Sequence, residues 1–276
     1  MTKNIYYDTE FLEGTQKKRF LGIPYGNTRN TIDLISIGMV DDEGNKYYAI
    51  SKDFNLREAW GRYDVKKKKY NEYHYKNGDA IYFTDSVDPE ALEIEHKNKL
   101  RKSKFSHSFI CGEEYKDYWI RENVLKPVWE QLKNKEYGGT ITRGFTYGNM
   151  KWLLNEYGKS NKQIAEEIVE FVYGFAVTGY PQGNTNKIIP KDINLFAYYG
   201  AYDHVALAWL YGKMIDLPKG FPKYTRDLQQ TSDEKKHLVK GRMKDHPDFP
   251  ENKGHHSAIF DAEWNKELHG FLKQLN

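Results

Sequence analysis

The chain has 276 residues, of which 39% are hydrophobic and 15% aromatic, and this composition excludes a disordered polymer. Its formal net charge of +3 excludes a polycation but permits a nucleic-acid partner. The single Cys111 excludes an intramolecular disulfide and fits a reducing compartment, so we expect a cytoplasmic protein. No apolar run approaches the length of a membrane span, and the opening MTKNIYYDTE lacks the apolar core of a signal peptide.

Three strands are predicted near the start of the chain. Residues 4–11 have the β-branched and aromatic composition of a strand, and residues 13–30 are rich in turn formers. Residues 31–40 begin with alternating apolar and polar side chains and end fully apolar, which predicts the second strand. A turn at 41–45 and a third strand at 46–51 complete a predicted antiparallel meander.

The periodicity fades between residues 55 and 118, where Tyr, Lys, Glu and His dominate. A loop of this length without its own structure would be unusual, so we expect an insertion with partial secondary structure, such as a helix over 89–103. Residues 118–132 then predict a short helix that is interrupted at Pro127.

A helix, a strand and another helix are predicted in the second half of the chain. Residues 160–174 predict a helix that Ser160 caps and that carries one apolar face. The apolar run 193–200 predicts a buried strand, and the helix that follows over 203–214 begins at or near Asp203.

The last part of the chain combines a polar segment with a long helix. Residues 231–254 carry charged clusters and two prolines, which predicts a surface loop or lid. Residues 255–275 predict one amphipathic helix. A strand meander followed by helix, strand and helix fits an α/β layer fold with a mixed sheet.

Two carboxylates stand close together on the first predicted strand. Asp8 and Glu10 are two residues apart, so their side chains point to the same face of that strand. Like charges side by side repel, and a shared face therefore needs a cation or a proton. Taken alone, the pair is more simply explained as solvent-facing acids on an edge strand.

Further candidate residues lie late in the chain. Asp203 follows a buried strand, where an α/β sheet binds ligands, although an aspartate at this place is also a common helix N-cap. His256 and Asp261 lie on adjoining faces of the predicted last helix and would both border one cleft. A His and an Asp there are more often surface residues, and His255 competes with His256 for the same role.

The order of these residues is more specific than any one of them. An acid pair on the first strand, an acid opening a middle helix, and a histidine four positions before a final acid (H-x4-D) resemble the DEDDh group of ribonuclease-H-like exonucleases. Only His256 stands at that spacing from Asp261, which decides between the two histidines. The resemblance implies a ribonuclease-H-like mixed β-sheet flanked by helices.

Longer stretches of the sequence narrow the resemblance: YYDTEF, TIDLISIGMV, KYYAIS, WIRENVLKPV, NLFAYYGAYDHVAL and FPKYTRDLQQ, of which GAYDHVAL is the most distinctive. These stretches are similar to polyadenylate-specific exoribonucleases of mycobacteria. Residues of about 55–116, 131–158 and 231–253 have no evident counterpart. We therefore expect one exonuclease domain over residues 1–276 with insertions at these three places, which leaves three roles open for them: covering the cleft, mediating a homodimer, or holding an accessory partner.

The resemblance implies a phosphodiesterase that uses two Mg²⁺ or Mn²⁺ ions. Asp8, Glu10 and Asp261 would hold one ion, and Asp8 would bridge to a second ion that Asp203 helps to position. His256 would be the general base, because an imidazole pKa near 6.5 suits that role. The product would be a nucleoside 5′-monophosphate released from the 3′ end.

Four further residues are candidates for substrate binding. Phe11 follows the acid pair and would stack on the terminal base, with a core aromatic as the equal alternative. Asp33 lies on the second strand and would meet a base or ribose, or face solvent. Tyr202 and Arg226 are weaker candidates of the same kind.

The predicted substrate is single-stranded nucleic acid, with RNA favoured over DNA and adenosine-rich RNA in particular. Two basic clusters, Lys66–Lys69 and residues 97–104, are most simply solvated loops, with phosphate contact as the alternative. The same carboxylates would serve a DNA exonuclease or a hydrolase of small phosphates. A non-catalytic RNA-binding protein on this fold is the alternative from another class, but it would be expected to lack one of the five catalytic residues, and all five are present.

Overall fold

The computed structural model describes residues 2–74, 80–84, 106–133, 143–174, 192–252, 254 and 256–275. The chain forms two compact units, Met1–Gly61 with Ile120–Asn276, and Arg62–Trp119. The predicted single domain with three insertions stays a prediction. The expected helix over 89–103 and the basic residues 97–104 lie outside the described residues.

The second unit contains a three-stranded antiparallel sheet. Its strands are β6 (Asp64–His74), β7 (Ala80–Thr84) and β8 (Ser106–Asp117), in the order β7-β6-β8. An ion pair between Lys66 and Asp117 joins the start of β6 to the end of β8, and Lys67 and Glu114 form a second ion pair between the same two strands. These two lysines of the predicted basic cluster are therefore paired with carboxylates.

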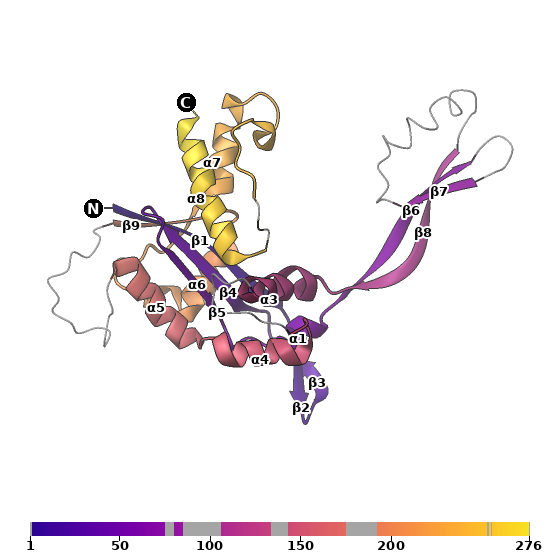
Figure 1. The fold of residues 1–276 in the computed structure, drawn as a ribbon, viewed down its shortest axis with the longest axis horizontal. Coiled ribbons are helices and arrows are strands. Elements are labelled where there is room, and N and C mark those ends of the chain that lie inside the picture. Colours follow the sequence, from indigo (N-terminus) through magenta and orange to yellow (C-terminus); the bar gives the residue numbers. More distant parts are fainter. Residues whose placement is uncertain are drawn as a thin grey trace. The chain divides into compact units, whose positions relative to one another are not determined.

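The first unit is built on a five-stranded mixed sheet in the order β10-β9-β1-β4-β5 (Figure 1). Strands β1 (Thr2–Gly14), β4 (Thr31–Asp41) and β5 (Lys46–Ile50) form the predicted antiparallel meander. Strand β9 (Asp192–Ala197) runs parallel to β1, and β10 (Arg226–Asp227) runs parallel to β9. Helices flank this sheet, which confirms the predicted α/β, ribonuclease-H-like class.

The side chains of β1 alternate between two hydrophobic clusters. Ile5 and Tyr7 pack against helices α5 (Asn161–Tyr173) and α6 (Ala201–Leu210) on one face of the sheet. Tyr6 packs with Leu268 of helix α8 (Ala258–Gln274) on the other face. The period-2 geometry of a strand therefore assigns even-numbered residues of this part of β1 to the α8 face.

A third cluster joins the first helices to the end of the meander. Helices α1 (Leu56–Gly61) and α4 (Tyr147–Tyr157) bury Leu56, Met150 and Leu153 together with Leu12 and Ile35 of the sheet. The α4 helix begins at Thr146, whose side chain accepts a hydrogen bond from the backbone of Asn149. The segment 147–157 is therefore part of the core of this unit.

One hairpin was not predicted, and one expectation about a helix is wrong. The turn-rich residues 13–30 contain a hairpin of β2 (Lys17–Phe20) and β3 (Ile23–Asn27). The helical run around Pro127 is continuous, because a π-helical turn η1 (Arg121–Leu125) leads directly into α3 (Lys126–Lys133). The wider π turn before the proline gives a physical reason: it accommodates a residue that has no N–H to donate and whose ring would clash with the carbonyl of the preceding turn.

Helix positions near the C-terminus also differ from expectation. The predicted loop from residue 231 is partly helical, with α7 (Leu228–Lys235) and the 3₁₀ turns η4 (Lys236–Leu238) and η5 (Met243–Asp245). Asp227 caps α7 by accepting hydrogen bonds from the backbone of Gln229 and Gln230. A third 3₁₀ turn, η3 (Met214–Asp216), follows α6. Among the described residues, no helix is long and apolar enough to cross a membrane.

Candidate active site

Strand β1 carries the first two candidate carboxylates on the face that α8 covers. Asp8 and Glu10 follow Tyr6 at two-residue steps, and Tyr6 packs against α8. The Glu10 side chain is only 8% exposed, although it is a charged group. A β-bulge interrupts the pairing of β1 with β4 between Glu10 and Phe11, where Ile35 of β4 has no partner on β1.

Helix α8 brings the third carboxylate to this pair. Asp261 lies in the first turn of α8, where a negative charge is favoured by the helix dipole. One ligand oxygen from each of Asp8, Glu10 and Asp261 lies within 4.8 Å of the others. The side chain of Asn265, one turn further along α8, donates a 3.0 Å hydrogen bond to the carbonyl of Tyr7 and fixes the helix against β1.

Asp203 reaches the same strand from the other face of the sheet. It lies in the first turn of α6, is 6% exposed, and its Oδ1 accepts hydrogen bonds from Thr9 N at 2.8 Å and Thr9 Oγ1 at 2.6 Å. Strand β9 pairs with β1 only as far as Tyr6. The Asp203 carboxylate therefore accepts the hydrogen bond from Thr9 N that a backbone carbonyl of a neighbouring strand would otherwise accept. Gly200 is the N-cap of α6, so Asp203 does not cap the helix.

Burial and neighbouring carboxylates raise the pKa of the two acids on β1, and burial raises that of Asp203. Desolvation raises the pKa of Asp8 well above its usual range, and the charges of Asp203, Glu10 and Asp261 raise it further. Desolvation likewise raises the pKa of Glu10, with contributions from Asp261 and Asp203. Burial raises the pKa of Asp203 to about 6, although the hydrogen bonds from Thr9 act in the opposite direction. The site thus concentrates negative charge that a cation would relieve.

A divalent metal ion fits this set of donors. Hard cations such as Mg²⁺ and Mn²⁺ prefer carboxylate oxygens, and the three clustered side chains offer only these. Among the residues that the structure describes, neither Asp8 nor Glu10 forms an ion pair with a lysine or arginine. The protein therefore leaves these charges to be balanced by a bound ion or by protons.

His256 lies in the turn that precedes α8, not on the helix as expected. Its φ of 63° is in the left-handed region, and α8 begins only after the N-cap Ser257. The Ser257 N–H donates a 3.2 Å hydrogen bond to Oδ2 of Asp261, so His256 is one peptide unit away from a group that contacts this carboxylate. His255, the competing histidine, lies outside the described residues.

Gln131 and Asn252, which the sequence pattern did not indicate, hold this turn and Asp261 in place. The Ser257 hydroxyl donates a 3.1 Å hydrogen bond to Oε1 of Gln131 in α3, and both residues are buried. Asn252 Nδ2 donates to Oδ1 of Asp261 at 2.6 Å. No spacing in the sequence points to either residue, because their partners are more than a hundred positions away or lie across an irregular loop.

Two of the four candidates for substrate binding lie together. The rings of Phe11 and Tyr202 stack with their centroids 5.9 Å apart and their planes at 29°. Phe11 comes directly after Glu10, and Tyr202 comes directly before Asp203. The Tyr202 side chain is 54% exposed, so this aromatic pair has a surface available to a ligand.

The other two candidates have partners elsewhere. Asp33 accepts a 2.5 Å hydrogen bond from Nε2 of the buried Gln16, at the base of the β2–β3 hairpin. Arg226 donates to Asn194 at 3.3 Å, and Asn194 is bonded in turn to Asn4, which precedes Asp8 by four strand positions or ~13 Å. The structure does not bring Arg226 to the carboxylates.

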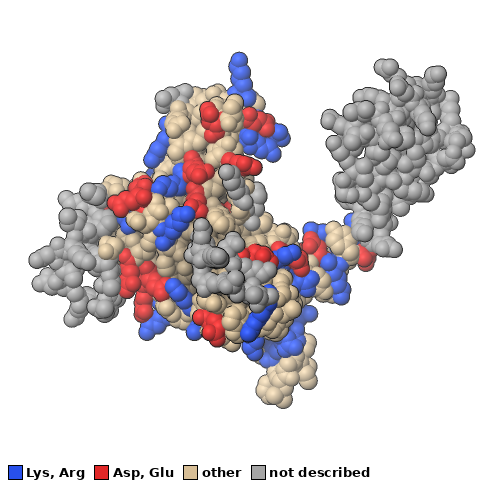
Figure 2. Space-filling model, viewed as in Figure 1, with Lys and Arg blue, Asp and Glu red and all other residues tan. Residues whose placement is uncertain are grey.

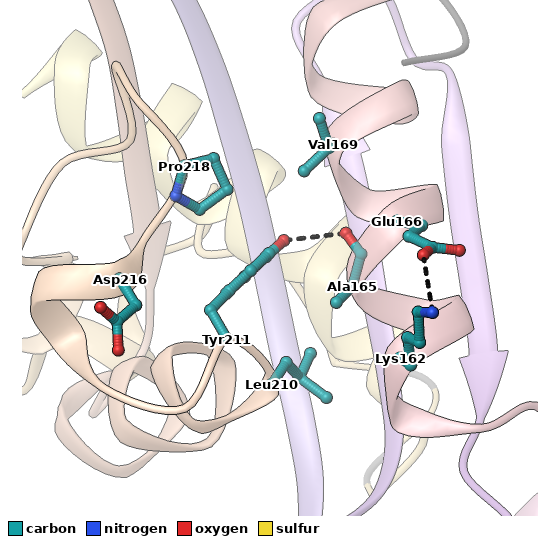
Figure 3. A pocket seen from close by; sticks show the side chains of 8 residues that line it. All are labelled: Lys162, Ala165, Glu166, Val169, Leu210, Tyr211, Asp216 and Pro218. Atoms are coloured by element: carbon teal, nitrogen blue, oxygen red, sulfur yellow. Dashed lines mark hydrogen bonds and ion pairs between the residues drawn. The ribbon is translucent and has the colours of Figure 1, made fainter. Parts of the chain in front are cut away.

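A separate cavity of about 290 Å³ lies between α5 and the C-terminal end of α6 (Figure 3). Its lining includes Lys162 and Glu166, which form a 3.9 Å ion pair, and Tyr211, whose hydroxyl donates to the carbonyl of Ala165 at 3.0 Å. None of the predicted site residues lines this cavity. The carboxylate cluster therefore remains the candidate active site.

Comparison with known proteins agrees with the predicted resemblance. No protein-family model matches the chain. The chain is 26% identical over 229 residues to the 3′-5′ exoribonuclease of Mycobacterium tuberculosis strain H37Rv, which covers 82% of this chain and 71% of that protein. The 3′-5′ exoribonuclease of a second strain of the same species has the same identity and coverage. Over most of its length, this chain thus resembles mycobacterial proteins named 3′-5′ exoribonucleases.

Proposed function

We propose that this protein is a 3′→5′ exoribonuclease of the DEDDh type, which hydrolyses single-stranded RNA to nucleoside 5′-monophosphates. The observation that carries the proposal is the cluster of Asp8, Glu10 and Asp261, with Asp203 hydrogen-bonded to the strand between the first two. The similarity to proteins named 3′-5′ exoribonucleases supports RNA as the polymer and the 3′ end as the point of attack.

The carboxylates would hold two Mg²⁺ or Mn²⁺ ions. Asp8, Glu10 and Asp261 would bind one ion, and Asp8 with Asp203 would bind the other. When bound, such ions lower the pKa of water and stabilise the negative charge that develops on a phosphodiester during hydrolysis. The contribution of the chain is to bring four carboxylates together from β1, α6 and α8, and to fix them before the substrate arrives.

His256 would act as the general base. An imidazole nitrogen of His256 would take a proton from the attacking water, which is the role that histidine most often has in general acid–base catalysis. The turn before α8 holds this residue next to Ser257, whose backbone contacts Asp261. The base and a metal-binding carboxylate therefore belong to one short, hydrogen-bonded segment.

The stacked rings of Phe11 and Tyr202 would receive the 3′-terminal base. Stacking of a base on an aromatic side chain contributes about 1–3 kcal/mol and tolerates different bases. Purines offer the larger ring surface, which is consistent with a preference for adenosine-rich RNA. Asp33 and Arg226 stay predictions for substrate contact. Asp33 belongs to β4, which pairs with β1, whereas Arg226 belongs to β10, which does not.

One experiment tests the proposal. The purified protein is incubated with oligo(A), mixed RNA or DNA, labelled at either end, in Mg²⁺ or Mn²⁺ and then in EDTA. We expect a ladder of products shortened from the 3′ end of RNA that EDTA and Asp8→Ala abolish. Asp216→Asn, an exposed carboxylate at the cavity of Figure 3, is the matched control and should leave the ladder unchanged.

The remaining outcomes point to the alternatives. Cleavage that persists in EDTA, or internal cuts alone, would contradict a metal-dependent exonuclease. A ladder on DNA but not on RNA would indicate the DNA exonuclease instead. RNA binding without any cleavage under all metal conditions would indicate a non-catalytic RNA-binding protein.

A further inference from the structure

The β2–β3 hairpin is exposed on both faces. All residues of both strands are solvent-exposed, and the largest apolar side chains at the tip are Phe20 (71% exposed), Leu21 (87%), Ile23 (69%) and Tyr25 (67%). An isolated two-stranded hairpin is only marginally stable in water, and clustered exposed apolar groups mark interaction sites. The hairpin therefore has the properties of a surface that another molecule covers.

The hairpin also carries a concentrated positive charge. Residues 14–32 contain Lys17, Lys18, Arg19 and Arg29 and no aspartate or glutamate, whereas the whole chain has a net charge of only +3. None of these four cations forms an ion pair within the described part of the chain. Figure 2 shows Lys and Arg side chains beside the uncharged end of this hairpin, at the lower edge of the view.

The base of the hairpin is held firmly in place. Gln16 is 5% exposed, its N–H donates to Thr28 Oγ1 at 2.9 Å, and its Nε2 donates to Thr31 Oγ1 at 3.0 Å and to Asp33. At the tip, Leu21 and Gly22 both have positive φ, and Arg19 Nη1 donates to the Gly22 carbonyl at 3.1 Å. The exposed groups are thus presented from a fixed base by an ordered tight turn.

The hairpin continues directly from the strand that carries the carboxylates. Lys17 lies seven positions after Glu10, so their Cα atoms are at most ~25 Å apart even if this segment is fully extended. Single-strand sites in proteins cover roughly 4–16 nucleotides. A strand whose 3′ end lies at the carboxylates therefore reaches the hairpin within the length of an ordinary single-strand site.

We propose that the β2–β3 hairpin binds the body of the single-stranded RNA, on the 5′ side of the nucleotide that is being removed. Lys17, Lys18 and Arg19 contact phosphates, and Phe20 and Tyr25 stack on bases. This inference rests on the proposed function and adds a second contact region to it. Cations next to exposed aromatic rings are the combination by which proteins hold single strands without regard to sequence.

A second copy of the chain is a poorer occupant of this surface. In a two-fold dimer through the hairpin, Lys17, Lys18 and Arg19 of one copy would meet the same cations of the other. Like charges directly opposite each other destabilise a strand pair. The charge of the hairpin thus favours a polyanion over its own copy.

The test measures RNA binding in EDTA, with Asp8→Asn in every protein so that nothing is cleaved. Fluorescence anisotropy follows labelled oligo(A) of about 16 and about 4 nucleotides. The hairpin variant is Lys17→Ser with Lys18→Ser and Arg19→Ser, and a second variant keeps Arg19, because Arg19 also caps the turn. The control variant is Lys162→Ser, Lys213→Ser and Lys219→Ser, three exposed lysines near the cavity of Figure 3 and the η3 turn that follows α6.

We expect the hairpin variant to bind the longer RNA at least tenfold more weakly and the short RNA within twofold of the parent. The slope of log affinity against log salt should fall by about 2, since each phosphate contact to a single strand contributes about 0.7. Phe20→Ser with Tyr25→Ser should weaken binding of the longer RNA at high salt as well. The control variant should leave both the affinity and the slope unchanged.

Three results would overturn the proposal. Unchanged affinity of the hairpin variants for the longer RNA would remove the hairpin from the RNA path. Equal losses in the hairpin and control variants would indicate general charge attraction. A loss of self-association or of binding to anionic vesicles, with RNA binding intact, would assign the surface to those partners. Cleavage by the chain with its native Asp8 is measured separately, so failure of the exonuclease proposal is distinguishable from failure of this one.

Discussion

Gly38 lies directly beneath the first turn of α8: a Cβ atom at this position would stand 2.3 Å from the carbonyl oxygen of Ala258. Gly38 is also the residue of β4 that pairs with Asp8 of β1. The absence of a side chain therefore lets the start of α8 lie against the sheet at the level of Asp8. Asp261, three residues beyond Ala258, comes within reach of the acid pair for this reason.

We expect Gly38→Ala to weaken both the fold and the metal site. The added methyl group must push the α8 backbone away, and overpacking of this kind costs about 1–3 kcal/mol. Urea unfolding should show the loss of stability, and calorimetric titration with Mn²⁺ should show weaker binding. Gly26→Ala is the control, because a Cβ at Gly26 would meet nothing within 4 Å. Undiminished Mn²⁺ affinity in Gly38→Ala would show that Gly38 is not needed to form the metal site.

Asp8→Asn should stabilise the metal-free protein while removing its activity. The raised pKa values of Asp8, Glu10 and Asp203 mean that deprotonating the folded state costs more than deprotonating the unfolded chain. This cluster therefore favours the folded state most below the unfolded pKa near 4, and that contribution is lost as pH rises through the folded values, about 6 for Asp203.

The melting temperature in EDTA tests whether the contribution of these carboxylates to stability falls as the pH rises. We expect Asp8→Asn to melt with the wild type near pH 4 and above it at pH 8, by about 2–4 °C for each kcal/mol gained. Mg²⁺ should raise the melting temperature of the wild type more than that of the variant, because only the wild type has the full ligand set. A variant that melts below the wild type at pH 8 in EDTA would show that burial of these charged carboxylates beside one another is not a dominant cost. Asp216→Asn is the control at an exposed carboxylate.

The sheet was predictable because its strands obey simple patterns. Residues 31–40 alternate and then become apolar, and the structure buries every residue from Leu34 to Asp41. The acid pair follows from the two-residue period of a strand, and Asp203 follows from its place after a buried strand. These are local properties, and local properties are what a sequence displays directly.

The hairpin and the turn at His256 were not predictable for a physical reason. Residues 17–27 have no buried face, so their side chains show no alternation by which a strand could be recognised. The helical pattern after residue 255 hides the start of α8, because Ser257 bonds to the distant Gln131 and α8 begins only at Ala258. Both features depend on the surroundings more than on the local sequence.

Asp41 should make the protein lose stability in acid. Burial alone would raise its pKa, but hydrogen bonds from Asn45 and the ammonium group of Lys3 outweigh this and lower it. A lowered folded pKa contributes stability above the unfolded pKa near 4 and loses it as pH falls through the folded value. We expect Asp41→Asn to cost about 1.5–3 kcal/mol at pH 7, as hydrogen bonds to a charged group do.

The difference in unfolding free energy between Asp41→Asn and the wild type should shrink as the pH falls below about 4. Urea unfolding from pH 7 to pH 3 measures it. Asp53→Asn provides a comparison, since Asp53 is an exposed carboxylate that accepts one hydrogen bond, from the backbone of Asn161. A difference that stays constant across this range would mean that the charge of Asp41 is not what stabilises the turn after β4.

Gln131 should act on catalysis by positioning His256 through Ser257. Gln131→Leu and Ser257→Ala each remove the same buried hydrogen bond, which holds the left-handed turn next to Asp261. A small misplacement of a catalytic group can cost up to about 10²-fold, so we expect kcat on oligo(A) to fall tenfold or more, with KM within twofold. Because one bond is involved, the double variant should be no slower than either single variant. Multiplied losses in the double variant would show that the two residues act on kcat independently and not through this bond. Lower thermal stability with unchanged kcat would show that the bond serves only the fold.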